Sequence, residues 1–120
     1  AVSGMPTLQF SLTAVMELVH AGLLSIEQLV QKMCHAPASL YQIANRGYIR
    51  PGYQADLVLV NPSKEWMVTN DCILSKCGWS PMEGETFHSK VEKTFVNGHL
   101  VYDNNQVDIH HRGQALTFDR

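Results

Sequence analysis

Long apolar runs, basic clusters and cysteine pairs are all missing from this 120-residue sequence. No stretch approaches the roughly 20 apolar residues that cross a bilayer, so we expect no membrane-spanning helix. The nine lysines and arginines are scattered and the formal net charge is −2, so the charges give no case for a nucleic-acid partner. We therefore expect a globular protein whose partners are neither membranes nor nucleic acids.

The three cysteines are too few and too irregular for a disulfide framework. Cys34, Cys72 and Cys77 form neither an even set nor a CxxC pair. A sparse, odd set is typical of a reducing compartment, and free cysteines are commonly buried in part. We therefore expect a cytoplasmic protein with free thiols.

The chain has about the length of one domain, but its pattern predicts a piece of something larger. It opens on Ala-Val-Ser-Gly-Met-Pro, which is typical of a loop entered from an earlier segment. The first third is predicted to be helical and is followed by three or four short strands. A sheet of so few strands is too small to bury the apolar faces of the helices. We expect this chain to pack against a larger body of the same protein.

An amphipathic helix is predicted from Leu8 to His20, because apolar residues recur there every three or four positions. Gly22 suits the left-handed residue that commonly ends a helix. The expected apolar face consists of Leu8, Leu12, Val15, Met16 and Val19.

A second helix is predicted to begin after Ser25, which has the spacing of a capping box with Gln28. We expect this helix to stop near residues 34–36, because Pro37 disfavours helical geometry in the residue before it. Pro37 itself suits the first turn of a short third helix, Pro37 to Tyr41. The expected buried face of the second helix consists of Ile26, Leu29, Val30 and Met33.

From residue 47 onward the pattern predicts strands and turns. Asn97-Gly98 is a strong signal for a type I′ hairpin turn. Residues 70–84 lack periodicity and carry glycines and a proline, so we expect a long ordered loop. The tail from Asp103 is polar apart from Leu116 and Phe118. The expected strands cover residues 55–60, 66–69, 91–96 and 99–102.

Residues with catalytic chemistry are present, but their spacing predicts no catalytic site. None of the six histidines falls in an HxH, HxxxH or HExxH arrangement that would place two imidazoles on one face of an element. Asp56 and Glu83 are isolated carboxylates, and a carboxylate where a turn meets a strand commonly accepts backbone N–H groups. There is no Gly-x-Ser-x-Gly elbow and no glycine-rich phosphate loop. The residues alone indicate an α+β piece without a catalytic constellation of its own.

Two segments carry a resemblance to a known superfamily. Residues 47–60 (GYIRPGYQADLVLV) resemble the G-x-I-x-x-G-x-x-A-D-L-V segment of the amidohydrolase superfamily, and residues 96–102 (VNGHLVY) are similar to its closing hairpin. The physical chemistry agrees, because Gly52 allows a turn, Ala55 permits close approach and Asp56 can accept turn N–H groups as the strand begins.

Three further segments narrow the resemblance to dihydroorotases. Residues 75–84 (SKCGWSPMEG) look like the S-K-x-x-x-(T/S)-P-(F/L)-x-G loop of that family, and residues 112–118 suggest its bacterial single-chain type. Residues 1–9 (AVSGMPTLQ) look like the loop after the eighth barrel strand, commonly A-P-x-G-x-x-G-x-E. This chain departs from that last pattern at Val2, Thr7 and Gln9.

The resemblance implies an α/β fold, namely the C-terminal end of a (β/α)8 TIM-barrel amidohydrolase plus strands of the accessory small β-sandwich domain. Residues 1–46 would be the last barrel helices, with the substrate-side loop at 1–7. Residues 47–120 would form part of the sandwich and the C-terminal tail. Active sites of such barrels are built from loops at the C-terminal face.

The resemblance also implies a reaction. In dihydroorotases a binuclear zinc site activates a hydroxide that attacks the ring amide of dihydroorotate, and the reverse direction closes N-carbamoyl-aspartate. Its zinc ligands and catalytic aspartate would lie upstream of Ala1, so no catalytic or metal residue is expected in this chain. In this chain, the resemblance implies a substrate-binding role for Ser3 and Gly4, whose backbone would hydrogen-bond the pyrimidine ring. The implied partners are the N-terminal remainder of the enzyme and a small-molecule substrate, and a homodimer is compatible.

Two alternatives stay open. Allantoinases and dihydropyrimidinase-like hydrolases would share the fold and the metal site, and upstream Arg and Asn residues for the substrate carboxylate would discriminate them. A non-catalytic amidohydrolase homologue, used as a scaffold, would lack the upstream HxH and the aspartate after the eighth strand.

Overall fold

The computed structural model describes residues 4–119 and divides the chain into two compact units. Unit 1 consists of Ala1–Leu23 and Asn61–Lys90, and unit 2 consists of Leu24–Val60 and Val91–Arg120. Both units are therefore built from segments that are distant in sequence. These units do not test the boundary after residue 46 that the sequence predicted between barrel helices and sandwich strands, so this boundary stays a prediction.

In unit 1 the predicted first helix is present as a short 3-10 turn, η1 (Leu8–Phe10), that leads into α1 (Ser11–His20). Gly22 adopts a φ of 71° at its end. The N–H of Leu23 binds the Leu18 carbonyl at 2.9 Å and that of Gly22 binds the Val19 carbonyl at 3.0 Å. This hydrogen-bond pair is a Schellman motif, so the prediction for Gly22 is confirmed.

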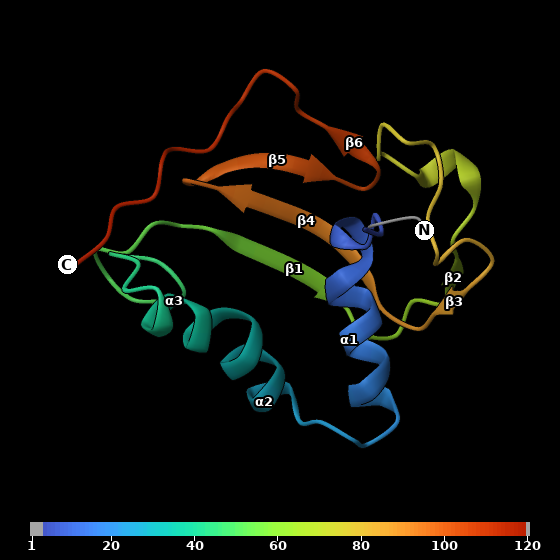
Figure 1. The fold of residues 1–120 in the computed structure, drawn as a ribbon, viewed down its shortest axis with the longest axis horizontal. Helices are drawn as coiled ribbons and strands as arrows, with labels where there is room; N and C mark the ends of the chain where they lie inside the picture. The colour runs from blue at the N-terminus through green and yellow to red at the C-terminus, as the bar shows by residue number, and fades with distance from the viewer. Residues whose placement is uncertain (1–3, 120) are drawn as a thin grey trace. The chain divides into compact units, whose positions relative to one another are not determined.

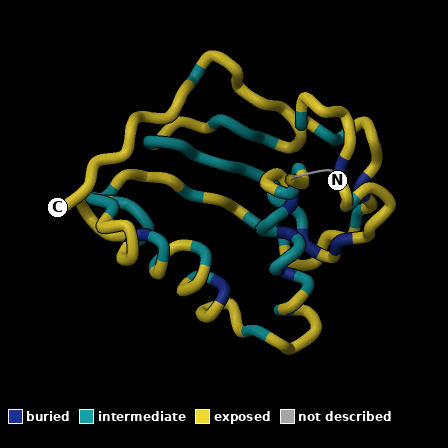
Figure 2. Tube along the Cα trace, in the orientation of Figure 1, coloured by how far each residue is buried: buried dark blue, intermediate teal, exposed yellow. Residues whose placement is uncertain are grey.

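The rest of unit 1 packs against this helix. Strand β2 (Trp66–Met67) pairs antiparallel with β3 (Thr86–Phe87), and between them lie the turn η3 (Asn70–Cys72) and an ordered loop, as the sequence predicted. The core consists of Phe10, Val68 and Phe87, each less than 5% exposed. Figure 2 shows buried positions along the helical segment of unit 1 and in the segments around β2 and β3.

In unit 2 the predicted capping box is present. The Gln28 N–H donates to the Ser25 hydroxyl oxygen at 3.2 Å, and the Ser25 N–H donates to the Gln28 side chain at 2.9 Å. Helix α2 (Ile26–Val30) begins there, and Leu29 is buried as expected, whereas Ile26 is 48% exposed.

The predicted stop near residues 34–36 is wrong. Helix α2 continues through one π turn, η2 (Gln31–His35), into α3 (Ala36–Leu40). The Ala36 N–H binds the carbonyl of Gln31, five residues earlier. This wider turn lies directly before Pro37, where a regular helix would clash with the proline ring. The backbone can therefore pass the proline without leaving helical geometry, and Ala36 has a φ of −62°.

The main sheet lies almost entirely in unit 2 and has the strand order β1-β4-β5-β6 (Figure 1). The strands are β1 (Leu57–Asn61), β4 (Lys90–Val96), β5 (His99–Asp103) and β6 (Gln106–Val107). The β4–β5 hairpin turns at Asn97 and Gly98, with φ values of 50° and 81°, as a type I′ turn requires. The sequence predicted this hairpin but not β6.

The C-terminal tail returns to the helical part of unit 2. Ile43 and Phe118 form an isolated antiparallel bridge, and the Ala44 N–H donates to the Thr117 carbonyl at 2.9 Å. This backbone pairing attaches the end of the tail to the segment after α3.

The chain thus combines helices with a sheet, as expected, while its assignment to a barrel and a sandwich stays a prediction. Across residues 4–119, no helix combines the length and the apolar character that crossing a membrane requires.

Candidate functional site

The predicted substrate loop is described from Gly4 onward, and Ser3 lies outside the described residues. Gly4 is exposed and has a φ of +90°, a conformation that side-chain-bearing residues rarely adopt. A Cβ added there would meet no heavy atom within 4 Å. The backbone at Gly4 is therefore open to approach, and its contact with a substrate stays a prediction.

Backbone hydrogen bonds shape this loop and join it to the 3-10 turn that follows. The Thr7 N–H donates to the Met5 carbonyl at 3.0 Å, and the Phe10 N–H donates to the Thr7 carbonyl at 3.1 Å. Phe10 is 3% exposed and packs in the core of unit 1. The loop is thus anchored at its C-terminal end by a buried aromatic ring.

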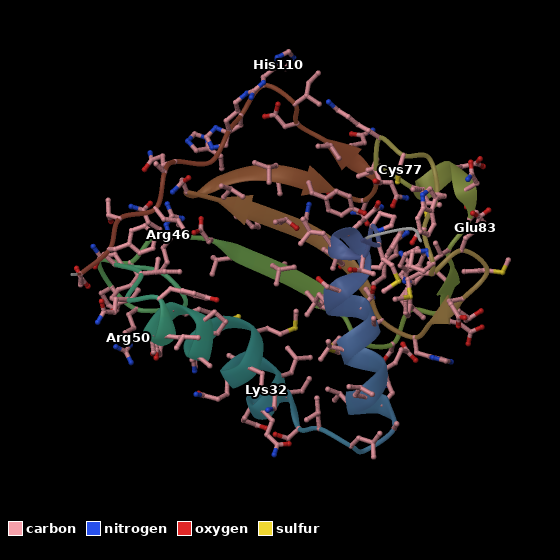
Figure 3. All side chains as sticks on the ribbon, in the orientation of Figure 1. Lys32, Arg46, Arg50, Cys77, Glu83 and His110 are labelled. Atoms are coloured by element: carbon pink, nitrogen blue, oxygen red, sulfur yellow. The ribbon has the colours of Figure 1, made fainter. Side chains whose placement is uncertain are left out.

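The loop 75–84, which carries the family-like motif, is held by its own polar groups. The Asn70 side-chain amide donates to the Gly78 carbonyl at 3.2 Å, and the Met82 N–H donates to the Ser80 hydroxyl at 3.1 Å. Ser80 is buried, whereas Cys77 and Glu83 are exposed on this loop (Figure 3). These contacts give residues 70–84 a defined shape.

Cys77 has an environment that favours its thiolate. The Ser75 hydroxyl lies 3.0 Å from the Cys77 Sγ, and this hydrogen bond lowers the pKa of the thiol. A free thiol at this position agrees with the prediction of free cysteines, since Cys34, Cys72 and Cys77 are all unpaired with one another.

In unit 2, Asp56 accepts a backbone N–H as the sequence predicted. Its Oδ1 accepts the Asn97 N–H at 2.8 Å, so the donor comes from the β4–β5 turn rather than from its own turn. Its Oδ2 forms an ion pair with Arg46, whose side chain is only 13% exposed (Figure 3). Asp56 therefore fixes the hairpin turn to the segment before β1, which is a structural role.

The histidines are distributed over both units and have different partners. His20 Nε2 lies 2.8 Å from the hydroxyl of the fully buried Ser89, and His88 contacts Glu17. His35 stacks on Tyr48 with ring centroids 4.2 Å apart. Two more, His99 and His111, stack on each other at 4.0 Å, and the His110 N–H donates to Asp108 at 2.8 Å.

This arrangement does not fit a zinc centre. Within residues 4–119, no three side chains of His, Cys, Asp or Glu converge in a way that could hold a metal ion. Stacked rings present their faces to each other, whereas zinc needs ring nitrogens aimed at one point.

Comparison with known proteins gives a consistent family. The matching family model is that of the amidohydrolase family, over residues 4–101. The dihydroorotase of Clostridioides difficile is 41% identical over 104 residues, which cover 86% of this chain and 24% of that relative. The dihydroorotase of Pyrococcus furiosus is 29% identical over 114 residues, which cover 95% of this chain and 27% of that relative.

A solved structure agrees with these relatives. The L-hydantoinase (dihydropyrimidinase) from Arthrobacter aurescens is 29% identical, with a TM-score of 0.85 over 91% of this chain and 25% of that chain. The present chain spans about a quarter of the length of the proteins it matches. Because the family model matches most of the sequence, the chain belongs to the amidohydrolase family.

Proposed function

We propose that the full-length protein carrying this chain is a zinc-dependent dihydroorotase. It interconverts N-carbamoyl-L-aspartate and dihydroorotate in the cytoplasmic, de novo pathway to UMP. The observation that carries the proposal is the 41% identity to a dihydroorotase across 86% of the chain. The dihydroorotase-like motif at residues 75–84 supports the same substrate class.

In this proposal the chain is the C-terminal end of a (β/α)8 barrel, residues 1–46, joined to part of a β-sandwich, residues 47–120. The described residues do not fit a zinc site, so we assign the zinc ligands and the proton-transferring aspartate to the upstream segment. The chain's own contribution to the reaction is then substrate binding and support of the loops around the site.

Substrate binding falls to Ser3 and Gly4 in this proposal. The positive φ and open surroundings of Gly4 support it, because backbone groups there can approach a flat ring without a side chain in between. The N–H and carbonyl groups of a ring amide match backbone carbonyl and N–H groups in hydrogen-bonding capacity.

The N-terminal remainder of the same protein is the proposed partner. Large apolar side chains in both units support it: Leu8 is 89% exposed, Leu40 75% and Ile49 88%. Large apolar side chains that are exposed in each unit are typical of surfaces that a further part of a protein covers. A homodimer of the full-length protein is compatible with the same surfaces.

A hydantoinase or dihydropyrimidinase is the second candidate, and the fold likeness to the Arthrobacter aurescens enzyme favours it. The fold and the ring-amide chemistry are shared, so the fold alone does not separate the two. Dihydroorotate carries a carboxylate that hydantoin and dihydrouracil lack, so an upstream arginine aimed at that carboxylate would favour the first candidate.

The assignment of the zinc ligands to the upstream segment is tested by comparing this chain, purified alone, with the purified full-length protein. We expect stoichiometric zinc and ring-amide turnover only in the full-length protein, measured by elemental analysis and by product formation. About one tightly bound zinc per isolated chain, lost when two of its histidines are replaced, would contradict the assignment of the ligands to the upstream segment.

A further inference from the structure

The side chain of Gln9 makes two hydrogen bonds to one distant backbone segment. Its Nε2 donates to the Cys72 carbonyl at 2.6 Å, and its Oε1 accepts the Leu74 N–H at 2.9 Å. These partners lie 63 and 65 residues away in sequence, within the same unit. A single amide thus binds the backbone on both sides of Ile73, much as a neighbouring strand would.

Gln9 joins the segment after the predicted substrate loop to the segment before the loop 75–84, which carries the family-like motif. Gln9 belongs to η1, which begins directly after the loop 4–7, and the Phe10 N–H ties η1 back to the Thr7 carbonyl at 3.1 Å. Leu74 directly precedes the loop 75–84. Cys72 and Ile73 also pack against the core cluster of unit 1, to which Phe10 belongs, so hydrophobic packing and the Gln9 hydrogen bonds hold the same segment.

We infer that Gln9 is a positioning residue for the proposed cyclic-amide site. Its amide holds the loop 75–84 in a fixed place relative to the loop 4–7, so that the substrate-side backbone is ordered before the ring arrives. A loop that is ordered in advance does not lose that conformational freedom on binding, and this improves substrate capture. The inference rests on the proposed function, because it takes the loop 4–7 to contact the substrate.

Near neutral pH, the Gln9 amide satisfies both partners, whereas a carboxylate at this position would not. The Cys72 carbonyl needs a donor and the Leu74 N–H needs an acceptor, and a primary amide supplies one of each. An ionised carboxylate at position 9 would still accept from Leu74 but would place an oxygen against the Cys72 carbonyl oxygen. A protonated carboxyl group supplies a donor and an acceptor again, so Gln9→Glu converts the contact into one that depends on pH.

The test uses the full-length protein with Gln9→Leu, Gln9→Glu and, as a matched control, Gln106→Leu, which removes an exposed glutamine on β6. For Gln9→Leu we expect the KM for dihydroorotate to rise about five- to thirtyfold, with kcat within about twofold of wild type. Hydrogen exchange at the Leu74 amide should quicken by a similar factor. The control should match wild type in both measurements.

For Gln9→Glu we expect the same defect near neutral pH. The ratio of its kcat/KM to that of wild type should rise as the pH is lowered from about 8 toward about 5, because the carboxyl group gains its proton. The corresponding ratio for Gln9→Leu should stay constant. This difference between the two pH profiles would assign the defect to the paired hydrogen bonds at position 9, and the rise in KM at nearly constant kcat separates positioning from a general loss of structure.

An unchanged KM and unchanged Leu74 exchange in Gln9→Leu would overturn the inference. A fall in kcat that follows loss of zinc or of the folded state in both variants would also overturn it. If wild type turns over no ring amide, the proposed function fails, and the Leu74 exchange rates still decide whether Gln9 orders the loop.

Discussion

Glu17 binds His88 through both of its carboxylate oxygens. Oε1 accepts the backbone N–H of His88 at 2.8 Å, and Oε2 accepts from its ring Nδ1 at 2.9 Å. Glu17 lies on α1 and His88 lies directly after β3, 71 residues away in sequence. Within unit 1, this pair therefore attaches the segment after β3 to α1.

The charges around the pair favour a protonated imidazole. The hydrogen bond to Glu17 and the charge of that carboxylate raise the pKa of His88, with a further contribution from Glu65, 3.7 Å from Nε2. Burial raises the pKa of Glu17, but its hydrogen bonds to His88 and the charges of His88 and His20 outweigh burial and leave it lowered. The His20 ring also lies close, with its centroid 5.9 Å from that of His88.

These shifts predict how the attachment depends on pH. The pKa of His88 is raised, so its contribution is complete below the ordinary imidazole pKa of about 6.5 and is lost as the pH rises through the raised value. The pKa of Glu17 is lowered, so its contribution is complete above its ordinary value and is lost as the pH falls through the lowered one. The attachment should be strongest between the two.

Hydrogen exchange of residues 86–90 in the full-length protein, corrected for the intrinsic rate, measures this dependence. Protection should fall in wild type as the pH rises above the ordinary imidazole pKa of about 6.5 and through the raised pKa of His88, and this slope should be lost in His88→Gln. His110→Gln, on the exposed tail, is the matched control and should keep the wild-type slope. Equal slopes in all three proteins would show that His88 does not titrate in this contact.

Gly47→Ala is expected to destabilise unit 2. Gly47 has a φ of +80°, and an added Cβ would lie 2.4 Å from the Ala38 Cβ and 2.9 Å from the Cys34 carbonyl oxygen. Left-handed strain and the steric clash together should cost about 2–4 kcal/mol of local stability. Native-state hydrogen exchange across residues 34–43 measures this loss.

Gly52→Ala separates the two causes. Gly52 has nearly the same φ, +83°, but an added Cβ would meet no heavy atom within 4 Å. Only the backbone strain remains, so the expected cost is about 1–2 kcal/mol. Equal costs at both positions would mean that Gly47 does not pack as closely on Ala38 as the structure has it.

Gly4→Val should impair substrate capture in the full-length protein. It adds a β-branched side chain at the position where the proposed function places backbone against the ring, at a φ that valine rarely adopts. We expect kcat/KM to fall roughly ten- to a thousandfold, with zinc content and melting temperature near wild type. Gly22→Val, at a φ of +71° with equally open surroundings, is the control and should leave kcat/KM unchanged. Normal binding of dihydroorotate by Gly4→Val would make Gly4 a structural glycine.

Features with local causes could be predicted from the sequence. The Schellman end at Gly22, the capping box of Ser25 and Gln28 and the type I′ turn at Asn97-Gly98 each depend on residues within a few positions of one another. The helix through Pro37 could not be predicted, because the π turn that accommodates the proline has no clear sequence signal. Strand β6 is too short and polar to show a strand pattern, and its pairing with β5 forms it.

The site was predictable only in part, because its contacts join distant segments. The motif around Gly4 pointed to a substrate loop, but nothing local connects Gln9 with Leu74, or Glu17 with His88. One signal was present for Gln9, which stands where the resembling family commonly has a glutamate. The Gln9 amide matches the Cys72 carbonyl, which accepts, and the Leu74 N–H, which donates. These two groups lie next to Gln9 only in the folded chain.

Competition between ring amides tests the central claim most directly. The full-length protein, purified with zinc, is given dihydroorotate, dihydrouracil and hydantoin, and kcat/KM is measured for each. The proposed function predicts that dihydroorotate is preferred by at least about a hundredfold, because its carboxylate would make a charge-assisted contact that the other two rings lack. Faster turnover of hydantoin or dihydrouracil, or turnover of none of the three, would contradict it.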